Sequence, residues 1–164
     1  MRIVSDIPAL SRGDVRRILS GLPPAKGYLV HAKPLRYRRT PHLAAMTDFS
    51  AKTITVQLPE PFYPFGEAVP YGARRRPGDR MQFIWLSEGV TFRTPRQVLR
   101  FLYCHEWMHV FGISGEGGRR VGETACDRFA LLNYMRPKVT VEDARRSLDW
   151  REGRRALGRT AAGR

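Results

Sequence analysis

Apolar side chains follow two different periods along the chain, and the period predicts which segments are strands and which are helices. Residues 52–58 alternate apolar and polar side chains, which predicts a strand covered on one face. Two short runs of large apolar residues, 27–32 and 81–86, predict further strands, and the second could be the sheet edge that binds a substrate. Residues 59–79 contain five prolines and have no such period, so we expect a long irregular loop there.

Helical periods follow recognisable start signals. They predict a short helix at residues 11–20, a long one at 95–111 with Gly112 as its C-cap, and two later ones at 123–135 and 140–156. Together with the strands, these helices predict an α+β domain with a twisted, mostly antiparallel sheet of three or four strands. The residues that mark the starts are Ser11, Asp14, Thr94, Pro95, Gln97 and Thr140.

The helix expected at residues 95–111 is apolar on almost every side, which is typical of a helix buried at the centre of a fold. Its second half contains three polar exceptions, and these cluster on one side. Burying two histidines and a glutamate without partners is energetically unfavourable, so this side of the helix should carry chemistry. The three residues are His105, Glu106 and His109.

Residues 105–109 read H-E-W-M-H and contain two of the chain's four histidines. The four-residue step places both imidazoles on one helix face, about 6 Å apart at Cβ, so they can share one metal ion. Glu106 is rotated by roughly 100° from His105 and can face a water molecule beside that ion. A zinc hydrolase needs this arrangement of two nitrogen ligands and a carboxylate base. The alternative is a pair of hydrogen-bonded core histidines.

A catalytic zinc needs a third protein ligand, and no histidine follows His109. Glu123 and Asp127 are one helical turn apart and share a face. We expect Glu123 to bind the metal and Asp127 to accept the outer N–H of a ligand histidine, which fixes its tautomer. Glu116 or Asp127 could instead be the third ligand, and both helix acids could simply be solvated residues near a helix start. An oxyanion donor is also expected; the candidates are Tyr28, His31, Tyr103 and an arginine.

H-E-x-x-H followed by E-x-x-x-D on the next helix resembles the gluzincin pattern of zinc metallopeptidases. The residue pattern of segment 123–137 looks most like that of small ImmA/IrrE-type metallopeptidases. The resemblance covers roughly residues 92–137. It implies a small zincin-like fold, a Zn²⁺ cofactor and a protein or peptide substrate. The residues to which it assigns roles are His105, His109 and Glu123 as ligands and Glu106 as general base.

Two other zincin patterns fit the chain less well. Residues 105–112 also match the opening of the metzincin pattern, which next requires a His or Asp where this chain has Gly115. Glu116 comes one residue late for that role, and Met135 could mimic a Met-turn. SprT-like DNA-repair proteases share the layout and the basic character, but they normally use a third histidine, which this chain lacks downstream.

The length of 164 residues predicts one domain, 1–157, followed by a basic flexible tail, 158–164. The chain has no long apolar run and no signal-like start, so we expect no membrane span and a cytoplasmic location. Cys104 and Cys126 occupy apolar helical positions and are expected to be packing residues. A ligand role is the alternative for Cys126, because it is three residues from Glu123.

The net charge of +14 comes chiefly from arginine, which clusters at residues 36–39, 74–80 and 145–164. Such a charge attracts polyanions and predicts contact with nucleic acid or an acidic protein, against the alternative of an ordinary solvated surface. The sequence as a whole predicts a zinc metallopeptidase. The alternatives are a basic nucleic-acid-binding module and a non-catalytic zincin-fold interaction protein.

Overall fold

The computed structural model describes residues 1–78, 82–114, 118 and 120–148. One sheet has four strands, and two longer strands form a separate ribbon. The strands are β1 (Arg2–Ser5), β2 (Leu29–Leu35), β3 (Ala44–Asp48), β4 (Thr53–Pro59), β5 (Phe65–Arg75) and β6 (Phe83–Phe92). The helices are α1 (Arg12–Ile18), α2 (Pro95–Ser114), α3 (Glu123–Asn133) and a further helix at residues 141–148.

The α+β class is confirmed, but the expectation of a mostly antiparallel sheet is wrong. The strand order is β1-β2-β4-β3, and β2 is parallel to both β1 and β4; β3 and β4 are antiparallel. The connections explain the mixture. The segment that contains α1 links β1 to the parallel β2, and β3 occupies the edge, so that β4 returns between β3 and β2. The alternation of apolar and polar side chains indicated which face of β4 is covered. It carries no information on whether neighbouring strands are parallel or antiparallel.

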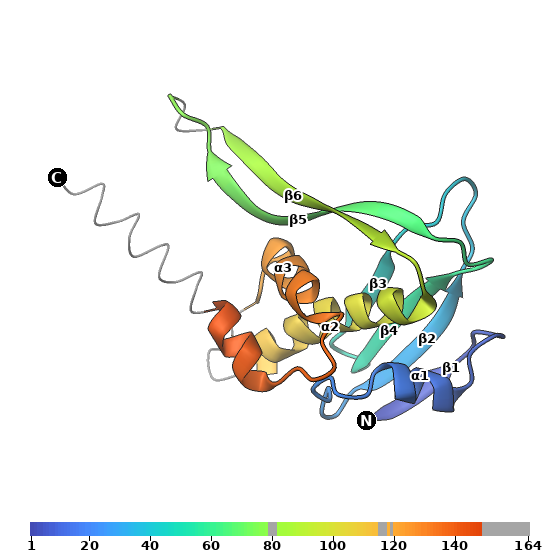
Figure 1. Cartoon of the computed structure of the whole chain (residues 1–164). Helices are drawn as coiled ribbons and strands as arrows, with labels where there is room; N and C mark the ends of the chain where they lie inside the picture. Colours follow the sequence, from blue (N-terminus) through green and yellow to red (C-terminus); the bar gives the residue numbers. More distant parts are fainter. Residues whose placement is uncertain (79–81, 115–117, 119, 149–164) are drawn as a thin grey trace.

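Helix α2 lies at the centre of the molecule (Figure 1). It packs against β3 and β4 on one side and against α3 on the other, and α3 in turn packs against β5. The alternating side chains of β4 that face this layer, Ile54, Val56 and Leu58, are at most 2% exposed. The nearly all-round apolar surface of α2 is therefore explained by neighbours on both sides.

The start of α2 follows the predicted cap, whereas its end does not. The backbone N–H of Gln97 donates to the Thr94 hydroxyl at 3.3 Å, and Gln97 Oε1 accepts the backbone N–H groups of Thr94 and Arg93. We expected the helix to stop before Gly112, but it continues to Ser114 with Gly112 buried inside it. The weak helix propensity of one glycine, about 1 kcal/mol, is outweighed by the burial of this turn.

The irregular loop expected at residues 59–79 is also an error, because most of it is strand β5. Pro70 is accommodated where the register of the ribbon shifts, between Pro70 and Gly72. Both strands of a two-stranded ribbon are edge strands, and each has one side without a hydrogen-bonded partner. A proline, which has no backbone N–H, can therefore occur in such a strand without interrupting the hydrogen bonds between the two strands. The strand expected at 81–86 belongs to this ribbon as part of β6. It is therefore not the sheet edge beside α2, which is β3.

A buried arginine joins three segments of the fold. Arg100 on α2 is 1% exposed, and its guanidinium donates to carbonyl oxygens at the ends of α1 and α3. Nε donates to Tyr134 at 2.8 Å, Nη1 to Ile18 and Ser20 at 2.8 and 2.9 Å, and Nη2 to Arg136. Carbonyls at helix C-termini carry partial negative charge, so they suit a cation. Burial lowers the pKa of Arg100, but a guanidinium stays charged in proteins.

The remaining helical predictions are largely confirmed. Ser11 and Asp14 form the capping box of α1, and α3 begins at Glu123 as expected, although it ends at Asn133 rather than at residue 135. Thr140 and Asp143 exchange capping hydrogen bonds at the start of the last helix. The continuation of that helix to residue 156, the domain limit at 157 and the tail lie outside the described residues.

Candidate metal centre

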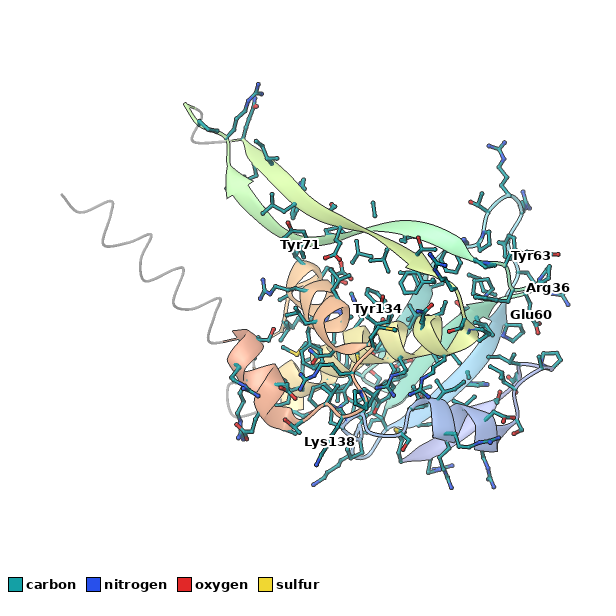
Figure 2. The ribbon with its side chains drawn as sticks, viewed as in Figure 1. Arg36, Glu60, Tyr63, Tyr71, Tyr134 and Lys138 are labelled. Carbon is teal, nitrogen blue, oxygen red and sulfur yellow. The ribbon has the colours of Figure 1, made fainter. Side chains whose placement is uncertain are left out.

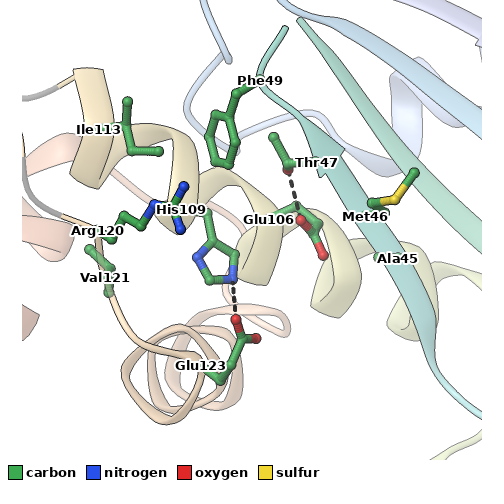
Figure 3. A pocket seen from close by; sticks show the side chains of 10 residues that line it. All are labelled: Ala45, Met46, Thr47, Phe49, Glu106, His109, Ile113, Arg120, Val121 and Glu123. Carbon is green, nitrogen blue, oxygen red and sulfur yellow. Dashed lines mark hydrogen bonds and ion pairs between the residues drawn. The ribbon is translucent and has the colours of Figure 1, made fainter. Parts of the chain in front are cut away.

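The two histidines of α2 and the first residue of α3 meet in one small space. The side chains of His105 and His109 are 14% and 17% exposed, and Glu123 contacts both from the neighbouring helix. Figure 3 shows the contact of Glu123 with His109. The Glu123 side chain is 76% exposed and lines a pocket of about 360 Å³. The sequence expectation that these three residues lie together therefore agrees with the geometry.

Each pair of these three residues has donor atoms within 3.4 Å of one another. His105 Nε2 is 3.2 Å from His109 Nε2 and 3.1 Å from Glu123 Oε2, and His109 Nε2 is 3.4 Å from Glu123 Oε1. Ligands that are 2.0–2.1 Å from a tetrahedral zinc stand about 3.3–3.4 Å from one another. Two imidazoles and a carboxylate are also a donor set that zinc accepts, so the residues fit this metal.

Asp127 holds the opposite side of His105. Its Oδ1 is 2.7 Å from His105 Nδ1, which leaves Nε2 free to face His109 and Glu123. Burial alone would lower the pKa of His105, but the hydrogen bond to Asp127 and the charges of Asp127, Glu106 and Glu123 raise it above its ordinary value. Asp127 thus lies where the sequence placed it, one turn after Glu123, and its position orients the histidine.

Cys126 offers a second arrangement, because His105, His109 and Cys126 also have donor atoms within 4.8 Å of one another. Its buried Sγ is 3.5 Å from His109 Nδ1. The Nδ1 atom lies on the opposite edge of the imidazole ring from Nε2, the atom that approaches His105 and Glu123. We favour the Glu123 set, because it uses Nε2 of both histidines and leaves each Nδ1 to an outer partner, Asp127 or Cys126.

Glu106 is directed away from the two histidines' shared space and is 6% exposed. Its Oε2 accepts a hydrogen bond from the Thr47 hydroxyl at 2.7 Å, so the carboxylate is held against the edge strand β3 (Figure 3). Glu106, His109 and Glu123 line the same pocket as β3 residues. The Glu106 carboxylate therefore opens onto the same pocket as His109 and Glu123.

Thr47 is a site residue that the sequence did not reveal. Strand β3 has no clear alternation, and its partner Glu106 follows 59 residues later in the chain. The turn after β3 gives one local indication of this strand. Asp48 accepts a hydrogen bond from the backbone N–H of Ala51, and Lys52 has a left-handed backbone conformation with a φ of 49°. A turn with a left-handed residue just before a clear strand predicts a hairpin, and hence a strand before it.

The structure separates the candidates for an oxyanion donor. Tyr103 is buried, and its hydroxyl is bonded to the backbone of Pro23 and Ala25, with burial raising its pKa. His31 contacts Asp6 on β1's side of the sheet, at 2.6 Å. Arg120, in contrast, lines the pocket together with Glu106 and His109. An arginine is thus the candidate that the geometry brings to the site.

The alternatives for the third ligand fare differently. Asp127 contacts the outer nitrogen of His105, so it does not share the space between the Nε2 atoms. Glu116 lies outside the described residues. Met135, the residue that could mimic a Met-turn, is 62% exposed and lies beside Gln97 in the first turn of α2. That position is two helical turns away from His105.

Comparisons of the chain with protein-family models, curated proteins and solved structures gave no match. Within the described part of the chain, no helix is long and apolar enough to cross a membrane.

Proposed function

We propose that the protein is a zinc-dependent metallopeptidase, with His105, His109 and Glu123 as the metal ligands and Glu106 as the general base. The observation that carries this proposal is the close approach of the Nε2 atoms of His105 and His109 to each other and to the two carboxylate oxygens of Glu123, at 3.1–3.4 Å, beside a second carboxylate that lines the same pocket. Zinc, when bound, would supply a Lewis acid that polarises a scissile carbonyl and acidifies water.

The chain's own residues would perform the proton transfers. Glu106 would accept a proton from the attacking water and deliver it to the leaving amine. Thr47 would hold the Glu106 carboxylate in position through its 2.7 Å hydrogen bond, and Asp127 would hold His105 in the tautomer whose Nε2 faces the metal. Arg120 in the pocket wall would stabilise negative charge that develops on the substrate.

The substrate class follows from the strand beside the site. β3 is the edge of the four-stranded sheet, and Ala45, Met46 and Thr47 line the pocket. An extended peptide can add to such an edge through main-chain hydrogen bonds. The pocket of about 360 Å³ would then take one side chain of that peptide. The cytoplasmic location inferred from the sequence stays part of this proposal.

The test is Glu106→Gln, which keeps the size and shape of the side chain but removes the base. Zinc-loaded wild type and variant would be compared on a pool of quenched fluorescent peptides, with zinc content measured by elemental analysis. We expect the variant to keep its zinc and to lose hydrolysis by about 10²–10⁴-fold. The matched control is Glu88→Gln, an exposed carboxylate on β6, which should behave as wild type.

Equal hydrolysis by wild type and Glu106→Gln would rule out the proposed mechanism. If both proteins bind one zinc and neither hydrolyses any peptide of the pool, the non-catalytic zincin-fold alternative replaces the enzyme.

A further inference from the structure

The β5–β6 ribbon has two halves with different environments. Its inner half packs on the body of the protein, and Phe65, Val69, Val90 and Phe92 are at most 8% exposed. The remainder projects away from the body as a two-stranded arm (Figure 1). We call residues 72–76 and 82–86 the outer arm.

The outer arm exposes large apolar side chains on both faces. Phe83 is 55% exposed, Ile84 37% and Trp85 64%. Successive strand residues point to opposite faces, so Phe83 and Trp85 share one face and Ile84 lies on the other. The residue paired with Trp85 is Ala73, which is too small to cover an indole ring. Apolar surface on both faces of a thin ribbon is typical of a binding element rather than of packing against the body.

The same segment is strongly basic. Residues 72–76 and 82–86 contain three arginines, Arg74, Arg75 and Arg76, and no acidic residue. Arg76 is exposed, and its guanidinium donates to the neutral Gln82 amide oxygen at 2.9 Å, so its charge is not neutralised by that contact. Aromatic rings and arginines thus occur together on one projecting element, a combination that binds bases and phosphates.

We propose that the outer arm binds single-stranded nucleic acid, with Phe83 and Trp85 stacking on bases and Arg76 contacting phosphate. Alternate residues of a strand are about 6.8 Å apart, which is about twice the 3.4 Å rise between stacked bases. One unpaired base therefore fits between the planes of Phe83 and Trp85. A base inside a duplex is already stacked on both sides and cannot enter that space, so the geometry favours a single strand. This site is independent of the metal centre and does not rest on the proposed peptidase activity.

The experiment uses the intact chain and fluorescein-labelled dT20 and rU20, with binding followed by fluorescence anisotropy between 50 and 200 mM salt. We expect Trp85→Ala to weaken binding about 5- to 150-fold, the effect of losing one base–aromatic stack. Its control is Tyr63→Ala, because Tyr63 is 59% exposed and lies away from the outer arm (Figure 2). That variant should bind like wild type.

A second pair of variants tests the phosphate contact. Arg76→Ala should weaken binding and reduce the slope of log K against log salt by about 0.7, the value for one phosphate contact on a single strand. Arg16→Ala removes an exposed arginine from α1 and should leave the slope unchanged. A metal chelator and Glu106→Gln should change neither affinity nor slope, which separates this site from the proposed peptidase.

Three results would overturn the proposal. The first is equal binding of dT20 and rU20 by wild type, Trp85→Ala and Arg76→Ala. The second is tighter binding of a 20-base-pair duplex than of dT20. The third is a wild-type dimer in light scattering that Trp85→Ala dissociates, because the outer arm would then be a protein interface.

Discussion

The candidate metal centre and the outer arm differ in how side chains match their surroundings. At the candidate metal centre, polar groups that are costly to bury lie inside the protein, and each has a partner: Glu106 with Thr47, and His105 with Asp127. In the outer arm, apolar groups that would gain from burial, such as Trp85, lie in solvent. In most stable folds, charged side chains lie in solvent and large apolar side chains are buried, so both of these exceptions are informative. The first exception indicates internal chemistry and the second indicates an external partner.

The largest expected effect concerns Arg100, a buried cation on the helix that carries the two histidines. Replacing it by methionine, Arg100→Met, would remove the donors of four carbonyl oxygens at once. We expect a loss of about 3–5 kcal/mol in the free energy of unfolding, measured by urea titration. The matched control is Arg96→Met on the exposed side of the same helix, which should stay within about 0.5 kcal/mol of wild type. Equal effects of the two variants would mean that the carbonyl cluster contributes nothing.

The next effect concerns the outer partners of the histidines. Asp127→Asn should weaken zinc binding about 10–100-fold, or about 1.4–2.7 kcal/mol, because the amide orients His105 less well than the carboxylate. Competition with a chromophoric chelator measures the affinity. Cys126→Ser is the companion variant and should still bind one zinc per chain. Loss of zinc in Cys126→Ser with full affinity in Asp127→Asn would reverse the roles assigned to them.

A smaller effect depends on pH and involves the last helix. Burial alone would raise the pKa of Asp143, but hydrogen bonds from Thr140 and the nearby Arg136 lower it to about 2. The folded state therefore favours the ionised carboxylate, and this stabilisation is complete above the ordinary value of 3.8 and is lost as the pH falls through about 2. Asp143→Asn should be less stable than wild type by on the order of 1 kcal/mol at pH 6. The difference should shrink between pH 4 and pH 2 in urea titrations; a constant difference would contradict the assignment.

The smallest effect is expected in the outer arm. Trp85→Ala should change the free energy of unfolding by no more than about 0.5 kcal/mol, because the indole is 64% exposed and its paired residue on β5 is the small Ala73. Thermal unfolding followed by circular dichroism measures this change. A loss above about 2 kcal/mol would show that the ring is buried in solution, and the contrast between the two regions would then disappear.

The parts of this fold that the sequence predicted are those with local causes. Thr94 and Gln97 lie three residues apart, as do Thr140 and Asp143, so their caps are visible in the sequence itself. The four-residue steps from His105 to His109 and from Glu123 to Asp127 are local in the same sense. Each predicted a shared helix face, and the structure has both.

The parts that were not predicted depend on distant residues or on the balance of competing terms. Thr47 meets Glu106 across 59 residues, and nothing within β3 indicates that contact. The parallel pairing of β2 with β4 depends on β3 lying at the edge of the sheet and not between these two strands. The prolines of β5 and Gly112 of α2 are unfavourable locally, and packing outweighs their propensities.

In the proposed metal site, Glu123 and not Cys126 completes the ligand set with the two histidines. X-ray absorption at the zinc edge of the zinc-loaded protein distinguishes the two residues, because zinc–sulfur and zinc–oxygen distances differ. We expect one zinc per chain with nitrogen and oxygen neighbours only, at about 2.0–2.1 Å. A sulfur neighbour at about 2.3 Å, or a chain that binds no zinc, would contradict this ligand set.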